Sequence, residues 1–176
     1  MQIKQAITPF LSYVDRAEEA AKLYTSTLPN SKILRTLANP MNDSVLAVEF
    51  ELAGVKFVAL NAGQDWKFTE AISLSISCNN QHELDLLWTQ LSADGGREVS
   101  CGWLQDKFGM FWQIVPVQLQ QWLESDEPLK IQRMFEALWQ MKKLDIAALQ
   151  QAFAGSDSLL PGRPKPRVLR FLQTKV

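Results

Sequence analysis

The side chains that could do chemistry in this sequence are mostly amides, hydroxyls and carboxylates. The stretch CGWLQDKFGMFWQIVP, residues 101 to 116, places one amide, Gln113, inside an otherwise apolar run. Three serines alternate with apolar residues between positions 72 and 78. Because successive strand residues point to opposite faces, Ser73 and Ser75 would share one polar face. These groups predict hydrogen bonding to a small ligand, and a solvent-exposed strand is the alternative.

A carboxylate, a phenol and several aromatic rings extend this candidate set. Glu49 lies on the unburied phase of a predicted strand and could be a general base if burial raised its pKa; a solvated surface carboxylate is the alternative. Tyr13 could present its phenol to a ligand or pack at its strand end. Concave sites combine aromatic walls with a few polar groups. The predicted ligand-binding residues are Tyr13, Glu49, Asn61, Trp66, Ser73, Ser75, Trp103 and Gln113.

Composition excludes several classes of protein. The chain has 176 residues and a net charge of −1, so no strong field draws it to nucleic acid or to a membrane surface. No apolar run approaches the ~20 residues of a membrane span. One histidine, His82, and two cysteines define neither a metal motif nor a disulfide framework. We therefore expect a cytoplasmic protein with no bound metal or cofactor, with Cys78 buried and His82 on the surface.

The elements that would position these residues occur twice. Residues 7–14 form a predicted strand, Asp15 and Glu18 a predicted capping box, and three strands follow at 32–38, 44–52 and 55–61. A second strand at 72–78 precedes a helix capped by Asn80 with Glu83, and strands follow at 97–104 and after Gly109. This internal repeat predicts an α+β fold of two βαβββ modules.

The remainder of the chain predicts helices. A stripe that includes Met134 and Leu138 indicates a buried helix or a dimer interface, and Asp145 caps a further short helix that ends at Gly155. We expect four segments: a first module at 1–62, a second at 63–117, C-terminal helices at 118–155 and a basic, proline-rich tail at 156–176. The tail has five Lys or Arg residues and one Asp, too few for a nucleic-acid module without a basic folded face.

The doubled module resembles the vicinal-oxygen-chelate superfamily, which includes glyoxalases, bleomycin-resistance proteins and extradiol dioxygenases. Within it the chain resembles the PhnB-like branch, whose members often carry the domain label 3-demethylubiquinone 3-methyltransferase. The stretches that carry this resemblance are ITPFLSYVDRAEEAAKLY, FELAGVKFVALNAG, KFTEAISLSI, CGWLQDKFGMFWQIVP and MKKLDIAALQQAF. The resemblance implies a homodimer and a cleft on the uncovered sheet face.

The superfamily's metal enzymes place one His, Glu or Gln ligand on each of four strands. The resemblance maps these positions onto Pro9, Val58 or Ala59, Ala71 beside Glu70, and Gln113. Proline, valine and alanine side chains cannot bind a metal, so this set is a poor divalent-metal site. On this mapping Gln113 faces the cleft, while Trp112 and Ile114 pack beneath the sheet.

Two functions are left open. The first is a small-molecule-binding protein or metal-independent enzyme of this fold, and the alternative is a metal-dependent lyase or dioxygenase. The second would require Glu49, Glu70 and Gln113 to converge. A Rossmann-type methyltransferase is excluded, because neither predicted helix follows a glycine-rich turn.

Overall fold

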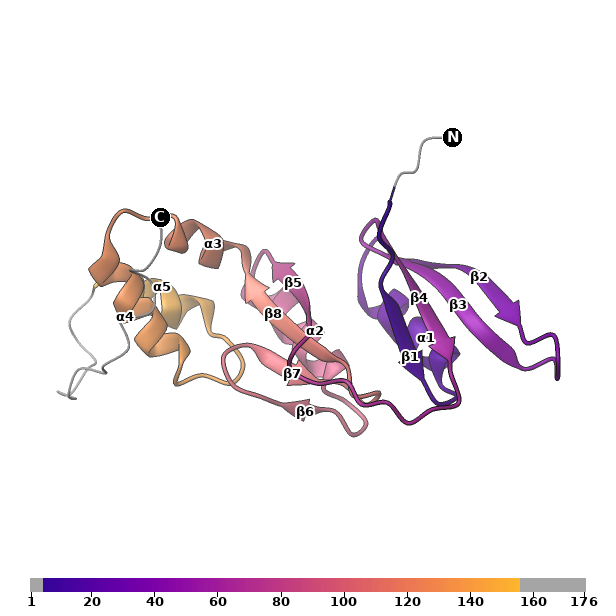
Figure 1. Cartoon of the computed structure of the whole chain (residues 1–176). Helices are drawn as coiled ribbons and strands as arrows, with labels where there is room; N and C mark the ends of the chain where they lie inside the picture. Colours follow the sequence, from indigo (N-terminus) through magenta and orange to yellow (C-terminus); the bar gives the residue numbers. More distant parts are fainter. Residues whose placement is uncertain (1–4, 156–176) are drawn as a thin grey trace, which may run out of the picture.

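The first module is a four-stranded sheet with one helix on one of its faces. A computed structural model describes residues 5–155. The elements of this module are β1 (Phe10–Tyr13), α1 (Ala17–Thr27), β2 (Lys32–Ala38), β3 (Val45–Leu52) and β4 (Val55–Asn61). The strand order is β1-β4-β3-β2, in which β1 runs parallel to β4 and the other pairs are antiparallel (Figure 1).

The second module repeats this topology. Its elements are β5 (Leu74–Cys78), α2 (Gln81–Leu91), β6 (Arg97–Glu98), β7 (Trp103–Gln105) and β8 (Phe111–Pro116), and its order is β5-β8-β7-β6. The segment predicted as strand at 97–104 is a hairpin of β6 and β7 that ends at Gln105. Cys101 and Gly102, at φ values of 62° and 81°, form the turn between them. The α+β fold with two βαβββ modules is confirmed.

Three helices extend the second module on the side away from the first (Figure 1). They are α3 (Val117–Leu123), α4 (Pro128–Leu138) and α5 (Ile146–Ala154). The turn after α4 is joined to the second sheet, because the Cys101 N–H donates to the Met141 carbonyl at 2.8 Å. The predicted cap of α5 is confirmed, since Asp145 accepts from the Ala148 N–H at 2.9 Å.

Among the described residues, no helix has the length and hydropathy that a membrane span requires. The predicted basic tail at 156–176 lies outside the described residues.

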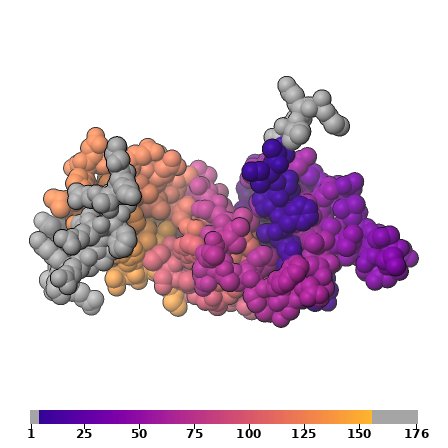
Figure 2. Space-filling view, viewed as in Figure 1, coloured from indigo at the N-terminus to yellow at the C-terminus, as the bar shows by residue number. Residues whose placement is uncertain are grey.

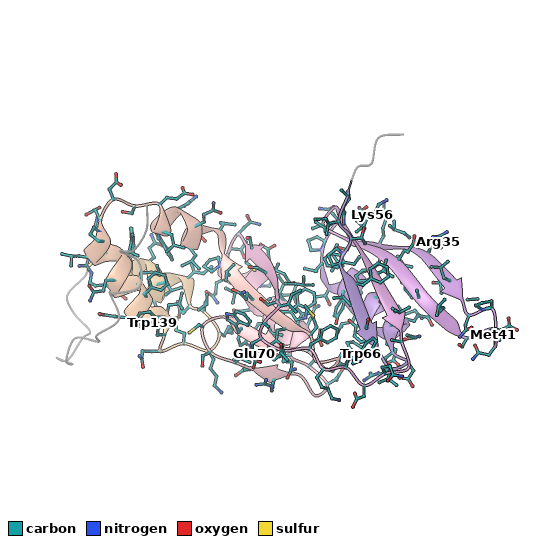
Figure 3. The ribbon with its side chains drawn as sticks, in the orientation of Figure 1. Arg35, Met41, Lys56, Trp66, Glu70 and Trp139 are labelled. Carbon is teal, nitrogen blue, oxygen red and sulfur yellow. The ribbon has the colours of Figure 1, made fainter. Side chains whose placement is uncertain are left out.

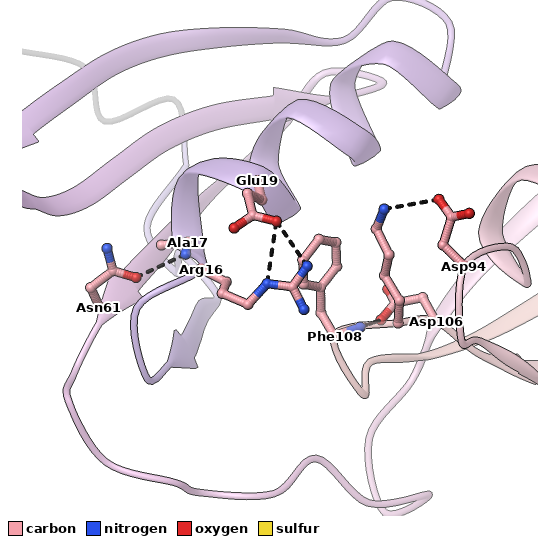
Figure 4. Close-up of polar contacts among 8 residues, drawn as sticks. Arg16, Ala17, Glu19, Asn61, Asp94, Asp106 and Phe108 are labelled. Carbon is pink, nitrogen blue, oxygen red and sulfur yellow. Dashed lines mark hydrogen bonds and ion pairs between the residues drawn. The ribbon is translucent and has the colours of Figure 1, made fainter.

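The two module helices begin differently. In α2 the predicted cap is confirmed: Asn80 Oδ1 accepts from the Glu83 N–H at 2.9 Å. In α1 the predicted capping box of Asp15 and Glu18 is wrong, because the N-cap is Arg16 and it makes no side-chain cap bond. The first helical N–H, that of Ala17, donates instead to Asn61 Oδ1 at 2.8 Å (Figure 4). A side chain from the end of β4 therefore replaces the local cap.

Each sheet buries one face under its helix. In the first sheet Val48 and Phe50 are fully buried, and in the second sheet Ile114 is. Of the two alternatives for Tyr13, packing is observed: Leu11 and Tyr13 are buried, whereas Phe10 is 61% exposed. The strand has apolar residues on both phases, so its pattern does not identify the buried face. Phe10 and Ser12 therefore lie on the uncovered face, and the face of Pro9 and Tyr13 is the helix side.

The two modules meet through a buried polar cluster. The Asp106 carboxylate accepts from the Tyr24 hydroxyl and from Trp112 Nε1, both at 2.8 Å. It also accepts from the N–H groups of Phe108 and Met110, at 2.8 and 3.0 Å. Burial raises the pKa of Asp106, and the four donated bonds act against that rise. This cluster joins α1 of the first module to the second module, and the two modules lie side by side in Figure 2.

Candidate functional site

Four of the predicted ligand-binding residues lie together on the uncovered face of the second sheet. Ser75 pairs with Gln113 across β5 and β8, and Trp103 pairs with Gln113 across β7 and β8. Gln113 Nε2 donates to Ser73 Oγ at 2.8 Å. Trp112 and Ile114, on the opposite phase of β8, are buried as predicted. The serines, the amide and the indole thus form one polar surface, which we call the polar face.

The polar face keeps unused hydrogen-bonding capacity. Within residues 5–155, Gln113 Oε1 and Ser75 Oγ have no hydrogen-bond partner, and Ser75 is exposed. An amide oxygen accepts, while a hydroxyl both donates and accepts. Because the bond to Ser73 holds the amide in one orientation, Gln113 Oε1 is directed away from that serine. The polar face can therefore offer a small polar molecule the Gln113 amide oxygen as an acceptor and the Ser75 hydroxyl as a donor or acceptor. The two residues lie opposite each other on neighbouring strands.

Three neighbours at the edge of the polar face were missed by sequence reasoning. Gln105 donates to the Gly109 carbonyl at 2.8 Å and accepts from Arg97 Nε at 2.6 Å. The Arg97 guanidinium lies 5.4 Å from the centroid of the Phe111 ring, within cation–π range. The alternation around Gln113 could have placed Phe111 on this face. Arg97 and Gln105 depend on the register of the β6–β7 hairpin, which no local pattern gives.

Glu49 is not brought to the polar face. It lies on the uncovered face of the first sheet, in register with Val58 and with Arg35. Its carboxylate pairs with the Arg35 guanidinium at 2.5 Å, and both groups reach solvent. The ion pair occupies one carboxylate oxygen, Oε1, and holds the group beside a cation at the surface. The arrangement therefore favours the surface-carboxylate alternative within this chain.

Asn61 and Tyr13 have contacts that give each of them a structural role. The Asn61 amide caps α1 through Ala17 and donates to the Val45 carbonyl at 2.8 Å, so both ends of the amide are used. The Tyr13 hydroxyl lies 3.2 Å from that of Tyr24, and burial raises the pKa of the Tyr13 phenol. Neither side chain presents a free polar group to the polar face.

Trp66 lies on the linker between the modules, beside a pocket where the two modules meet. Its indole is 63% exposed (Figure 3). It lines a pocket of about 510 Å³ together with Tyr13, Gln105 and the segment 107–109. The eight predicted residues thus divide between the polar face, the first sheet and this junction pocket.

The donors present do not fit a divalent metal. The side chains of Pro9 and Val58 have no atom that can bind a metal. A carboxylate oxygen of Glu70 lies 3.6 Å from a terminal nitrogen of the Arg97 guanidinium and forms an ion pair with it. Residues 5–155 contain no group of three His, Cys, Asp or Glu side chains able to hold an ion. Cys78 is fully buried as predicted, and burial raises the pKa of its thiol to about 12. His82 is exposed, also as predicted.

Comparison with known proteins supports the fold and the family. A family model described as 3-demethylubiquinone-9 3-methyltransferase matches residues 5–115. The PhnB protein from Bacillus cereus superposes with a TM-score of 0.60 at 29% identity, over 64% of this chain and 100% of that one. Protein PA1353 from Pseudomonas aeruginosa gives a TM-score of 0.54 at 17% identity, over 64% of this chain and 98% of that one.

A more distant structure shares only the fold. The fosfomycin resistance protein FosX from Listeria monocytogenes gives a TM-score of 0.53 at 13% identity, over 70% of this chain and 100% of that one. A comparison with curated proteins found no match. The resemblance to the vicinal-oxygen-chelate superfamily is confirmed by the family model and by the fold.

Proposed function

The chain belongs to the 3-demethylubiquinone-9 3-methyltransferase family, and from this premise we propose that it binds a small polar molecule at the polar face. It acts there as a binding protein or as a metal-independent enzyme of the vicinal-oxygen-chelate fold. One observation carries the proposal: the Gln113 amide is held by Ser73 at 2.8 Å on an uncovered sheet face. Its oxygen and the neighbouring hydroxyl of Ser75 are available to a ligand.

Metal independence is supported by the side chains that are present. A FosX variant structure from Listeria is described as complexed with Mn(II) and 1S,2S-dihydroxypropylphosphonic acid. In this chain the two carboxylates that would have to join Gln113 each face a guanidinium, Glu49 that of Arg35 and Glu70 that of Arg97. A carboxylate committed to an arginine is a poor first ligand for a divalent ion. The metal-dependent lyase or dioxygenase is therefore the second candidate.

The family name includes a methyltransferase, but neither strand-to-helix connection of this chain has the glycine-rich turn of a Rossmann-type methyltransferase. A Rossmann-type methyltransferase holds its cofactor at a glycine-rich turn between a strand and a helix. Here β1 reaches α1 through Val14, Asp15 and Arg16, and β5 reaches α2 through Asn79 and Asn80. We therefore expect no binding of S-adenosylmethionine in calorimetry.

We further propose that the protein is a cytoplasmic homodimer. In a dimer the uncovered faces of segments 1–62 and 63–117, from different subunits, could close one cleft. An exposed apolar side chain on the uncovered face of the first sheet supports pairing, that of Phe10 at 61% exposure. The free cysteines Cys78 and Cys101 support a reducing compartment. Sedimentation velocity on wild type and Phe10→Lys tests the dimer, which the charged variant should weaken.

Binding at the polar face is tested by a ligand screen read as thermal stabilisation. A compound present at 100 times its dissociation constant should raise the free energy of unfolding by about 2.7 kcal/mol. Gln113→Ala and Ser75→Ala should lose most of that stabilisation. Gln120→Ala, an exposed amide on α3 that contacts Glu124, is the matched control. If the stabilisation persists in both polar-face variants, the site assignment is wrong.

Metal content separates the two candidate functions. Protein purified without chelator should contain no stoichiometric divalent ion, and its melting temperature should not respond to Mn²⁺, Zn²⁺ or Ni²⁺. One tightly held ion per chain, lost in Gln113→Ala, would establish the metal-dependent alternative.

A further inference from the structure

The junction pocket borders the polar face at Gln105, which lies at the edge of both. It is formed by the end of β1, linker residues 65–68 and the loop 105–109, so both modules contribute to it. Its lining includes none of Ser73, Ser75 and Gln113. Its volume of about 510 Å³ lies within the range of small-molecule sites.

One wall of the junction pocket is aromatic. The Tyr13 ring lies edge-to-face against Phe68, at 5.5 Å between centroids, and against Phe108, at 6.1 Å. Trp66 adds an indole that, within the described residues, pairs with no other aromatic ring and stays 63% exposed. An exposed indole beside three packed rings has a free face on which a flat molecule can stack.

Cationic groups border this wall. The Arg16 guanidinium lies 4.6 Å from the Phe108 centroid, and Lys107 Nζ lies 5.6 Å from it (Figure 4). Arg16 donates to Glu19 through Nε and one terminal nitrogen, at 3.2 and 2.8 Å. Its second terminal nitrogen therefore keeps its donors. Lys107 Nζ donates one hydrogen bond to Asp94, at 3.1 Å. An ammonium group has three N–H donors, so two are left for a ligand.

Unused donors, rather than the charge balance, favour a ligand with an acceptor group. Each of the three cations that line the pocket already pairs with a carboxylate: Arg16 with Glu19, Lys67 with Asp65 and Lys107 with Asp94. Asp15 adds a further carboxylate to the lining. Arg16 and Lys107 nevertheless come from different modules, flank the same ring and keep N–H donors, so one anionic group could contact both.

We propose that the junction pocket binds a flat organic anion, of which an aromatic carboxylate is the simplest kind. Its ring stacks on Trp66 beside Phe108, and its carboxylate accepts from Arg16 and Lys107. Such a ligand would contact the first module, the linker and the second module at once. It would therefore stabilise the junction between the modules, independently of occupation of the polar face.

The test is a titration of ¹⁵N-labelled full-length protein with 2-naphthoate, followed by nuclear magnetic resonance. We expect the shifts to be concentrated at the Trp66 indole and at residues 105–109. The uncharged 2-naphthalenemethanol, with the same rings, should bind at least about tenfold more weakly, because it lacks the charge-assisted bonds. Cyclohexanecarboxylate, with the charge but no flat ring, should also bind more weakly. Equal affinity for naphthoate and the alcohol would overturn the anion assignment.

Matched variants locate the site. Trp66→Ala and Arg16→Gln should each lower the affinity for 2-naphthoate at least about threefold. Trp139→Ala and Arg35→Gln remove an exposed indole and an exposed guanidinium elsewhere and should leave it unchanged. Gln113→Ala should also leave it unchanged, so this proposal and the polar-face proposal can fail separately. Naphthoate binding that is lost in Gln113→Ala, or kept in both pocket variants, would refute a junction site.

Discussion

Replacing Asp106 by asparagine should lower the free energy of unfolding by about 2–5 kcal/mol. The carboxylate accepts four hydrogen bonds, two on each oxygen, and is only 3% exposed. An amide can present its oxygen to the Phe108 and Met110 N–H groups. Its NH₂ group would then face the Tyr24 hydroxyl and Trp112 Nε1, which are both donors in the wild type.

The magnitude follows from those two lost bonds. Hydrogen bonds to charged groups contribute about 1.5–3 kcal/mol each, and a buried donor left without an acceptor costs about 1–3 kcal/mol. Trp112 Nε1 has no rotatable hydrogen and stays unsatisfied. The Tyr24 hydroxyl can turn its hydrogen toward Tyr13, 3.2 Å away, which recovers part of the loss. The expected total is therefore below the sum of two full bonds.

Urea unfolding followed by tryptophan fluorescence and by circular dichroism measures this change. Asp94→Asn is the matched control, because that carboxylate is 74% exposed and, among residues 5–155, pairs only with Lys107. Its effect should stay within about 0.5 kcal/mol. In Tyr24→Phe, one donor to Asp106 is lost, so the double variant should be less destabilised than the sum of the single variants. A cost below about 1 kcal/mol for Asp106→Asn would refute the view that this carboxylate is a central acceptor at the module junction.

Three further outcomes are expected. Asn61→Ala removes the α1 cap and the bond to Val45, and should cost about 1–2 kcal/mol in urea unfolding, whereas Asn42→Ala in an exposed turn should cost less. Iodoacetamide at pH 8.5 should label Cys101 but not Cys78 in the folded protein. Burial raises the pKa of the Cys78 thiol to about 12, so almost none of it is the reactive thiolate at that pH. Equal labelling of the two cysteines, measured by mass spectrometry, would contradict this prediction. Gly102→Ala should destabilise the protein more than Gly54→Ala. Both glycines have a positive φ, 81° at Gly102 and 88° at Gly54, so both substitutions strain the backbone. At Gly102 the added Cβ would also lie 3.0 Å from atoms of Ile114 and Leu144, whereas at Gly54 it would meet open space.

The polar face could be predicted from the sequence because strand alternation is a local property. Ser73 and Ser75 are two residues apart, and Gln113 lies between the apolar neighbours Trp112 and Ile114. A period of two assigns each of these residues to a face before any strand partner is known. The cap of α2 was predictable for the same reason, since Asn80 and Glu83 lie three residues apart.

The errors arose where local patterns were ambiguous or a distant residue took part. The first strand has four residues and apolar side chains on both phases, so only the position of α1 shows that Tyr13 is buried. The cap of α1 comes from Asn61, 44 residues from Ala17, where the local sequence offered Asp15. The break between β6 and β7 depends on a backbone turn at Cys101 and Gly102 that also bonds to the segment after α4.

The sequence by itself determined the repeated modules, the caps of α2 and α5, and the residues that share the polar face. Each depends on contacts within a few positions of the chain. Only the tertiary structure decided that Asp106 is buried beneath Tyr24, 82 residues away, and that Arg16 and Lys107 flank one aromatic ring. These contacts form when two modules with similar local patterns pack together, and the geometry of that packing depends on the shape of both surfaces at once.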